Sequence, residues 1–340
     1  MHKLDNLDIG YTYDDLLIRP IKSEVHSRQD VNLSTELFDG VILKTPIIAA
    51  PMNTVAEHKM LIKMFQLGGL GILHRFKGTE DMDYQMSIVG NSVPKEYCAF
   101  AVGVNDRDKF ILTHLYSRAG IVCIDLNVGH HSRVEDMIGY ISEEFPNLKI
   151  IAGNVSTYKG AYDLCMAGAD CIRATNGGGS ACTTLTTTGV GIPTATSLLE
   201  CHLGVKQAEK ETGDKKTLIA DGGLKNSGDM AKALAIGADA VMVGGLLSGS
   251  SCCPETAFFT ENGEFRAKYM GMASEEAQIA RFGKRQSHIA PEGKSLSIPP
   301  KGKTANIVLE LAAGLKSAFS FVNAKNLKEF QANSEFILRK

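Results

Sequence analysis

The sequence lacks the features of several common classes of protein. Its 36 Lys and Arg nearly balance its 38 Asp and Glu, so the net charge of −2 shows no basic excess of the kind that nucleic-acid binders carry. No apolar run approaches the roughly 20 residues that cross a bilayer. The first fifteen residues contain no hydrophobic core of a secretion signal. We therefore predict a cytoplasmic protein that binds neither nucleic acid nor membrane.

The eight cysteines also lack a recognisable pattern. No CxxC pair is present, and the adjacent Cys252 and Cys253 are poorly placed to bind one ion, so a zinc–thiolate site has no support. In a chain of 340 residues without a secretion signal we expect reduced thiols. Cys123, Cys165 and Cys171 lie in apolar periodic segments, and we predict that they are small core residues.

Eight short apolar segments recur along the chain and indicate its fold. Each is continuous rather than alternating, which is typical of strands buried on both faces of a parallel sheet. Helix-like stretches separate them, and no dinucleotide fingerprint of an open doubly wound sheet follows the first. The sequence thus predicts an α/β fold, a TIM (β/α)8 barrel. The segments are 46–52, 68–75, 98–104, 120–129, 148–155, 169–178, 217–223 and 238–245.

No Pro/Ser-rich linker divides the chain, so we predict a single domain over residues 1–340. The barrel is expected at about 46–250. Residues 204–217 are expected to be an insertion, and the part of the chain after about Cys252 an addition to the barrel. That addition comprises a flap at about 269–303, without regular structure, and a C-terminal helical segment at about 304–340.

The segment GGGSACTTLTTTGVGIPT, residues 177–194, carries a single thiol, Cys182. Its composition predicts a loop rather than a helix. The loop follows the sixth strand and so lies over the end of the barrel where active sites form. A catalytic cysteine needs exposure and proton-handling partners, and Thr183 and Thr184 would supply hydroxyl groups. A Thr-rich surface loop with an incidental cysteine is the alternative.

Paired glycines end the seventh and eighth strands. Gly222 and Gly223 follow Asp221, and Gly244 and Gly245 follow the next strand. Such pairs let backbone N–H groups approach an anion, and the loops after these two strands are the usual phosphate site of a barrel. They predict a phosphorylated small ligand, with Asp221 on a ribose hydroxyl. Two ordinary tight turns are the alternative.

In the expected flap, Glu292 is a candidate proton carrier. Long loops over an active site are usually functional, which favours this role. A solvated surface carboxylate is the alternative.

As an ordered set, eight segments resemble the IMP dehydrogenase/GMP reductase family, and they span almost the whole chain. They read YTYDDLLIRP, APMNTVAE, GGLGILHR, GGGSACTT…TGVGIPT, IADGGLKNSGDMAKALAIGADAVMVGG, YMGMAS, EGK and LAAGLKSAFSFVNAKNLKEF. The GMP reductase branch is nearer, because only about 22 residues separate the second and third strands and leave no room for a regulatory domain pair. The short flap also lacks the Arg-Tyr pair of the dehydrogenases. APMNTVAE and GGLGILHR look closer to the dehydrogenase branch.

The resemblance implies NADPH-dependent reductive deamination of a purine nucleoside 5′-monophosphate through a covalent adduct on the cysteine. The reaction would convert GMP, or a closely related GMP-like or deoxy nucleotide, to IMP and ammonia. NADH is the alternative cofactor, and the resemblance further implies a potassium ion and a homotetramer. An IMP dehydrogenase without regulatory domains and a non-catalytic nucleotide-binding barrel are the alternative functions.

The resemblance also assigns residues to these roles. Cys182, Thr184 and Glu292 would be catalytic. Asp125 and Asn127 would contact the cofactor, and the backbone carbonyls of Gly177, Gly179 and Cys182 would bind potassium. The substrate-binding residues would be Met52, Ser180, Asp221, Gly222, Gly223, Gly244, Gly245, Met272, Ser274 and Gly293.

The sequence departs from the family around the expected substrate. His288 and Ile289 stand where reductases usually carry Tyr and Arg, and Asn53 stands where Asp is usual. Thr175 and Asn176 occupy a run that is otherwise built from small residues. We expect the chemistry to be retained, on a base close to guanine rather than on guanine itself.

Overall fold

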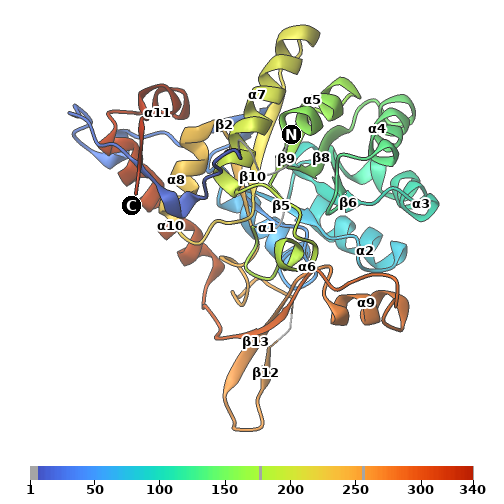
Figure 1. The fold of residues 1–340 in the computed structure, drawn as a ribbon. Coiled ribbons are helices and arrows are strands. Elements are labelled where there is room, and N and C mark those ends of the chain that lie inside the picture. The colour runs from blue at the N-terminus through green and yellow to red at the C-terminus, as the bar shows by residue number, and fades with distance from the viewer. Residues whose placement is uncertain (1–6, 176–177, 255–256, 340) are drawn as a thin grey trace.

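The computed structural model describes residues 7–175, 178–254 and 257–339. Eight parallel strands close into a barrel in the order β10-β11-β4-β5-β6-β7-β8-β9 (Figure 1). Each lies within one of the eight predicted segments, which confirms the TIM-barrel prediction. The strands are β4 (Ile47–Ala49), β5 (Leu70–Leu73), β6 (Ala99–Val102), β7 (Ile121–Asp125), β8 (Lys149–Val155), β9 (Cys171–Ala174), β10 (Thr217–Asp221) and β11 (Ala240–Val243).

A ring of helices surrounds the barrel, and each strand is followed by one of them. The helices are α1 (His58–Gln66), α2 (Thr79–Gly90), α3 (Asp106–Leu115), α4 (Ser132–Glu144), α5 (Tyr158–Met166), α7 (Thr194–Thr212), α8 (Ser227–Ile236) and α10 (Thr304–Phe321). None of the helices in the described part of the chain is long and apolar enough to cross a membrane.

The eighth helix of the ring, α10, comes from the part of the chain that we expected to follow the barrel as a C-terminal helical segment. It packs against α8, and Gly314 of α10 lies so close to Ser227 of α8 that a Cβ would collide with the serine hydroxyl. The flap is therefore the loop between β11 and α10. Because loops that follow barrel strands lie at the C-terminal end of the barrel, this connection places the flap over the active-site end.

The flap has regular structure of its own, contrary to prediction. An antiparallel sheet is formed by β12 (Ala257–Phe259), β13 (Phe265–Met270) and β14 (Ser295–Ile298), and α9 (Glu275–Phe282) lies between its last two strands in the chain. The β12–β13 hairpin projects away from the barrel in Figure 1. The division of the chain into a barrel, a flap and a C-terminal segment of one domain stays a prediction.

Two further local predictions are wrong. The Thr-rich loop contains a short helix, α6 (Thr184–Thr188), in which the Thr188 hydroxyl donates to the Thr184 carbonyl at 2.7 Å. Gly189 ends it at φ 69°, a left-handed conformation that glycine adopts readily. The segment 204–217 is not an insertion, because residues 204–212 are the second half of α7.

Alternate residues of the barrel strands point inward, and their character changes along each strand. In β7 the inward series is Ile121, Cys123 and Asp125, and in β9 it is Cys171 followed by Arg173. Strand residues two apart face the same side, so these series run from an apolar lower layer to a charged upper layer. The fold thus places charged side chains at the C-terminal end of the barrel.

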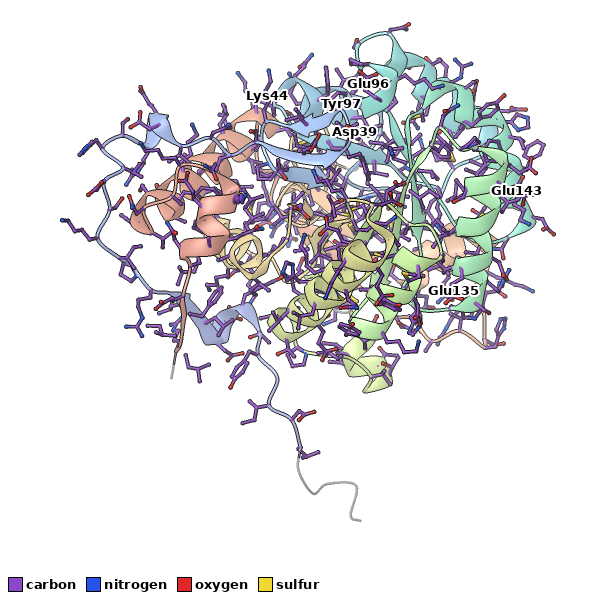
Figure 2. The ribbon with its side chains drawn as sticks, turned by 90° about the horizontal axis from the view of Figure 1, so that it is seen from above. Asp39, Lys44, Glu96, Tyr97, Glu135 and Glu143 are labelled. Carbon is purple, nitrogen blue, oxygen red and sulfur yellow. The ribbon has the colours of Figure 1, made fainter. Side chains whose placement is uncertain are left out.

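A hairpin closes the opposite end of the barrel. It consists of β2 (Thr35–Phe38) and β3 (Val41–Leu43), and its apolar side chains share one buried cluster with the interior residues of the strands. The Thr217 hydroxyl donates to the Leu37 carbonyl at 2.9 Å, and the Ile42 N–H donates to the Tyr97 hydroxyl at 3.1 Å. Figure 2 labels Asp39 of this hairpin and Tyr97 in a view from above.

The remaining elements join the two ends of the chain. Strand β1 (Leu16–Ile18) pairs antiparallel with β15 (Phe336–Leu338), and α11 (Leu327–Asn333) precedes β15.

Candidate active site

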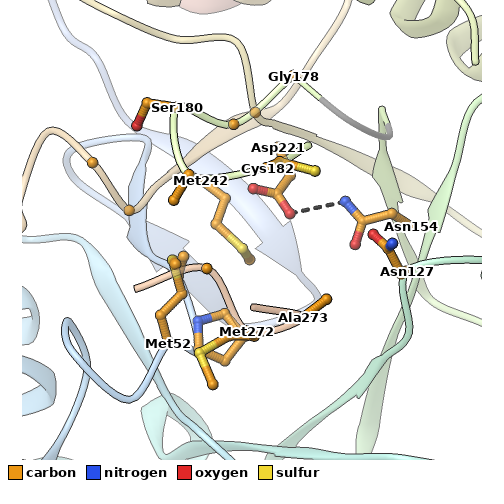
Figure 3. A pocket seen from close by; sticks show the side chains of 18 of the residues that line it. Met52, Asn127, Asn154, Gly178, Ser180, Cys182, Asp221, Met242, Met272 and Ala273 are labelled. Atoms are coloured by element: carbon orange, nitrogen blue, oxygen red, sulfur yellow. Dashed lines mark hydrogen bonds between the residues drawn. The ribbon is translucent and has the colours of Figure 1, made fainter. Parts of the chain in front are cut away.

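A cavity of about 640 Å³ lies at the C-terminal end of the barrel, a size typical of small-ligand sites (Figure 3). Thr184, Ser274 and Gly293 do not line it, and Gly177 is outside the described residues. The predicted site residues that line it are Met52, Asp125, Asn127, Gly179, Ser180, Cys182, Asp221, Gly222, Gly223, Gly244, Gly245, Met272 and Glu292.

Four side chains form a connected group that we call the Cys182 cluster: Cys182, Thr184, Glu292 and Asn127. The Cys182 Sγ lies 3.2 Å from the Thr184 Oγ1, and the Thr184 hydroxyl donates to the Glu292 carboxylate at 2.8 Å. The Asn127 amide donates to Thr184 Oγ1 at 3.0 Å and to Glu292 Oε2 at 2.6 Å. A thiol is thus linked to a carboxylate through one hydroxyl. Asn127 was expected only at the cofactor, and its contact with Thr184 and Glu292 was not predicted.

Backbone pairing brings the flap to this cluster. The Thr183 N–H donates to the Glu292 carbonyl at 2.9 Å, and the Glu292 N–H donates to the Ala273 carbonyl at 3.0 Å. Gly293 bridges both Cys182 and Ser274. A Cβ on Gly293 would lie 3.0 Å from the Ser274 nitrogen and 3.2 Å from the Ala181 oxygen, so a side chain there would push the strands apart. Gly293 and Ser274 therefore hold Glu292 in place.

Below the Cys182 cluster lies a buried ion-pair network of Arg173, Asp125 and Asp221. Arg173, only 5% exposed, lies 2.7 Å from a carboxylate oxygen of each aspartate. The Asn154 amide donates to Asp221 at 2.9 Å, the dashed line in Figure 3. Burial alone would raise the pKa of Asp125, but the charges of Arg173 and Arg75 outweigh it and hold the pKa below its usual value. Arg173 was not predicted, although an arginine two residues after Cys171 in an apolar strand was a visible signal.

A third part of the cavity, which we call the glycine corner, consists of Gly244, Gly245, Ser180 and Tyr269. A Cβ on Gly245 would lie 2.7 Å from the Ser180 hydroxyl, and one on Gly244 would lie 3.2 Å from the Tyr269 hydroxyl. Burial is the main cause that raises the pKa of Tyr269, so this phenol stays a hydrogen-bond donor. The Ser180 and Tyr269 hydroxyls thus lie beside the backbone of Gly244 and Gly245, where no side chain occupies the space between them. Tyr269 was not predicted.

The second glycine pair, Gly222 and Gly223, lies next to this corner in the cavity lining. Their φ angles of 103° and 76° are in the region that favours glycine.

Three thioethers also line the cavity. They belong to Met52, Met242 and Met272, which Figure 3 labels, and the Met52 sulfur lies 3.9 Å from the Tyr269 hydroxyl of the glycine corner. The Met272 sulfur accepts a hydrogen bond from the Asn53 N–H at 3.4 Å. Methionine adapts its shape and contacts flat rings well, so this wall suits an aromatic base.

The region beside β7 has a donor set that fits a nicotinamide. Arg75, Phe76, Asp125 and Asn127 line it, and the Arg75 guanidinium lies 5.0 Å from the centre of the Phe76 ring. The Arg75 Nε is buried, lies 3.6 Å from Asp125 Oδ2 and makes no hydrogen bond to a described residue. The Arg75 Nε is thus a free donor near the Phe76 ring and the Asn127 amide, and it could donate to the carboxamide oxygen of a nicotinamide.

The potassium prediction rests on backbone carbonyls. The Gly179 carbonyl accepts the Cys182 N–H at 3.0 Å and keeps a second lone pair for an ion, so the turn is compatible with one. The roles of Gly179 and Cys182 as ligands stay predictions, as does that of Gly177.

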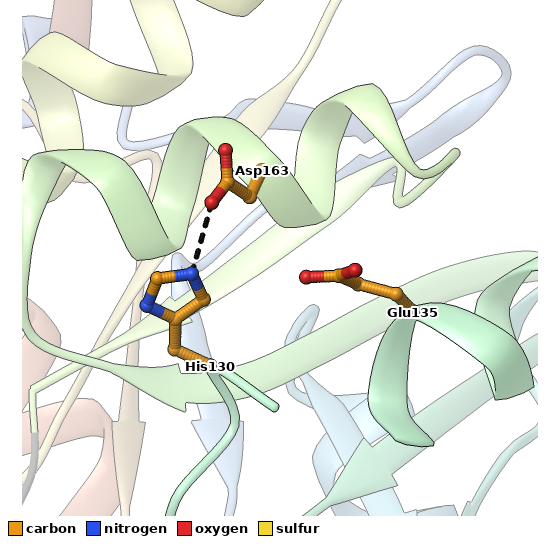
Figure 4. Close-up of side chains that lie close together, drawn as sticks. All are labelled: His130, Glu135 and Asp163. Atoms are coloured by element: carbon orange, nitrogen blue, oxygen red, sulfur yellow. Dashed lines mark hydrogen bonds and ion pairs between the residues drawn. The ribbon is translucent and has the colours of Figure 1, made fainter. Parts of the chain in front are cut away.

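A separate group with metal-ligand side chains lies outside the cavity and consists of His130, Glu135 and Asp163 (Figure 4). His130 Nε2 lies 2.9 Å from Asp163 Oδ2, and the Lys159 ammonium lies 2.7 Å from the same oxygen. Asp163 is therefore neutralised by side chains already present.

Three thiols of the barrel differ from Cys182 in burial. Cys123, Cys165 and Cys171 are buried, as predicted, and burial raises the pKa of Cys123 and of Cys165 to about 12. Cys182 is half-buried and lines the cavity. Because the thiolate is the reactive form, these buried thiols are inert.

Comparison with known proteins shows the family to which the chain belongs. The profile of the IMP dehydrogenase / GMP reductase domain matches residues 10–340. The chain is 32% identical to human GMP reductase 1 over 97% of its own length and 95% of the relative. It is 33% identical to the GMP reductase of Klebsiella pneumoniae, over 97% and 95% of the two chains. With the GMP reductase of Buchnera aphidicola (strain Tuc7) it shares 31% identity over 97% and 94%. The chain therefore belongs to the IMP dehydrogenase/GMP reductase family.

Proposed function

We propose that this protein is a GMP reductase-type oxidoreductase that deaminates GMP reductively to IMP and ammonia, with NADPH as the reductant. The single observation that supports this most is the Cys182 cluster. There the thiol lies 3.2 Å from the Thr184 hydroxyl, and that hydroxyl lies 2.8 Å from the Glu292 carboxylate. Family membership supports the reaction class, and the adjacent glycine corner supports a phosphorylated substrate.

The substrate would lie across the cavity. Its 5′-phosphate would accept hydrogen bonds at the glycine corner and from the N–H groups of Gly222 and Gly223. Asp221 would accept from a ribose hydroxyl, because Arg173 and Asn154 occupy one of its oxygens and leave the other free. The base would contact Met52 and Met272, with its C2 atom toward Cys182.

The chemical step would begin at the Cys182 sulfur. The thiolate attacks C2 of the purine, the bond from C2 to the exocyclic nitrogen breaks, and the nitrogen leaves as ammonia. As the thiolate forms, the Cys182 proton passes through the Thr184 hydroxyl to Glu292, along the hydrogen bond in which Thr184 donates. Thr184 then gives a proton to the leaving nitrogen and takes one back from the protonated Glu292. Asn127 fixes the hydroxyl and the carboxylate relative to each other.

When bound, the nicotinamide supplies the hydride that reaches C2 of the covalent adduct. Arg75, Asp125 and Asn127 would hold it on the open side of the ring. The bond from C2 to sulfur then breaks, its electrons return to Cys182 as thiolate, and IMP is released. A potassium ion at the carbonyls of Gly179 and Cys182 would fix the loop that carries the thiol. A homotetramer and a cytoplasmic location stay predictions.

The test is to mix purified protein with GMP and NADPH, follow the oxidation of the nicotinamide and identify the product by mass. Formation of IMP and ammonia is expected. Oxidation of IMP with NAD⁺ in the absence of GMP turnover would instead favour a dehydrogenase without regulatory domains. Tight GMP binding without turnover in either direction would favour a nucleotide-binding barrel.

A second candidate substrate is a purine nucleotide close to GMP, such as a deoxy or ring-modified one. The observation that favours it is Ile289, which lines the cavity with an aliphatic side chain where reductases usually carry Arg. A screen of GMP, dGMP and related nucleotides decides between them, because efficient turnover of GMP itself would dispose of the altered substrate.

A further inference from the structure

The cationic side chains that line the cavity are almost all paired with a carboxylate. Arg75 lies beside Asp125, Arg173 lies between Asp125 and Asp221, and Lys225 pairs with Asp14. Lys301 is the exception among the described residues. Its ammonium donates to the carbonyls of Gly245 and Leu246, the latter at 3.3 Å, and no described carboxylate lies within ion-pair distance. One positive charge of the cavity thus lacks a counter-charge.

The backbone around Lys301 is fixed to the turn that follows β11. The Lys301 N–H donates to the Gly249 carbonyl at 2.9 Å, and the Ser251 N–H donates to the Gly302 carbonyl at 2.8 Å. Gly302 also forms a bridge with Ser250. The side chain therefore extends from an anchored position back toward Gly245, and little ordering remains to be done when a ligand binds.

The surroundings of the ammonium suit an anion. Lys301 reaches the glycine corner, where the Ser180 and Tyr269 hydroxyls converge on Gly245. An ammonium has three donors, and two carbonyl contacts leave one for a ligand. Although the residue as a whole is exposed, burial of the ammonium lowers the pKa of Lys301. A phosphate dianion would offset that desolvation, and a neutral ligand would not.

We propose that Lys301 binds the 5′-phosphate of the substrate and makes the enzyme select a nucleotide over the corresponding nucleoside. This proposal rests on the proposed function for the placement of the phosphate at the glycine corner. The Lys301 proposal adds to the proposed function a residue of the flap that recognises the phosphate through its positive charge. The three paired cations do not have this role, because their charges are compensated before a ligand arrives.

The test compares Lys301→Met and Lys301→Arg with Lys303→Met, which removes an exposed charge two residues further along the chain. Steady-state kinetics are measured with GMP and with guanosine, which lacks the phosphate. For Lys301→Met we expect a 10- to 100-fold rise of KM for GMP, roughly the value of one charged hydrogen bond, with kcat nearly unchanged. The kcat/KM for guanosine should stay as in the wild type. Lys301→Arg should recover part of the loss, and Lys303→Met should behave as wild type.

Two results would overturn the proposal. One is an unchanged KM for GMP in Lys301→Met, and the other is an equal loss for GMP and guanosine, which would mean that Lys301 only supports the fold. A binding measurement separates this proposal from the reaction itself. If the wild type does not turn over GMP, calorimetric titration with ribose 5-phosphate still decides. Binding that weakens at least tenfold in Lys301→Met supports the phosphate role, and binding that is absent in the wild type or unchanged in the variant ends it.

Discussion

Two neighbouring regions of the cavity hold their charged groups in opposite ways. In the buried ion-pair network, Arg173 lies 2.7 Å from both Asp125 and Asp221, and all three belong to barrel strands. In the Cys182 cluster, the thiol and Glu292 come from two different loops that meet through short backbone bridges. The network compensates its charges before any ligand binds, whereas the cluster joins a thiol to a carboxylate through one hydroxyl. Strands supply rigidity here, and loops supply reactive groups.

The largest effect that this comparison predicts is on the thiol. Cys182→Ala should reduce turnover by at least about 10³-fold, because the nucleophile is lost while the binding groups remain. GMP binding, measured by calorimetry, should change by no more than a few-fold. Cys252→Ala, at a thiol outside the cavity lining, is the matched control and should turn over normally. Retained turnover in Cys182→Ala would end the covalent mechanism.

The carboxylate of the same cluster is expected to have the next largest effect. Glu292→Gln keeps the shape of the side chain but cannot resupply a proton, so kcat should fall by about 10²- to 10⁴-fold. KM should change little, since Glu292 is not placed on the phosphate or the ribose. Glu310→Gln, at an exposed position of α10, serves as the control. A Glu292→Gln variant with normal kcat would assign the proton to another group.

The ion-pair network should respond mainly in stability. Arg173→Met leaves Asp221 without its cation and Asp125 with only the more distant Arg75, and should lower the free energy of unfolding by about 3–5 kcal/mol in urea denaturation. The control is Arg118→Met, whose surface pair with Asp83 at 2.6 Å should contribute only about 0–1 kcal/mol. Equal losses in the two variants would mean that burial of the network does not matter.

The smallest expected effect is a change in acid sensitivity. The pKa of Asp125 is lowered in the folded protein, so its contribution to stability is complete above the unfolded pKa of about 3.9 and is lost as the pH falls below it. Asp125→Asn should be less stable than the wild type at neutral pH. The difference in unfolding free energy should shrink when the pH is lowered from about 5 to about 3. A constant difference over this range would contradict the assigned shift.

The same contrast explains what the sequence could predict. All eight barrel strands were found because a buried strand shows itself in a short continuous apolar run, and the thiol was found because it stands in an unusual local composition. Arg173 was missed because its partners are 48 positions away in both directions, and only closure of the barrel brings them together. Tyr269 and Lys301 were missed because the flap folds into a sheet that no local pattern indicated.

The α6 helix shows the limit of composition. Its Thr residues disfavour a helix on propensity, yet the Thr188 hydroxyl bonds back to the Thr184 carbonyl and Gly189 supplies the stop. These contacts hold a helix of five residues, although its threonines have a low helix propensity. Local propensity is therefore least informative where a short segment is held by its own side chains and by a neighbouring loop.

The β2–β3 hairpin that fills the lower end of the barrel determines from which side a molecule can enter and leave the cavity. With that end sealed by Leu37 and its neighbours, the described part of the chain leaves the flap side as the route by which a molecule enters or leaves the cavity. For the proposed function, the nucleotide, the reductant and the released ammonia would then share one entrance, and the last of them to bind would block the exit of the others. Product release, more than binding affinity, would then limit the rate of turnover.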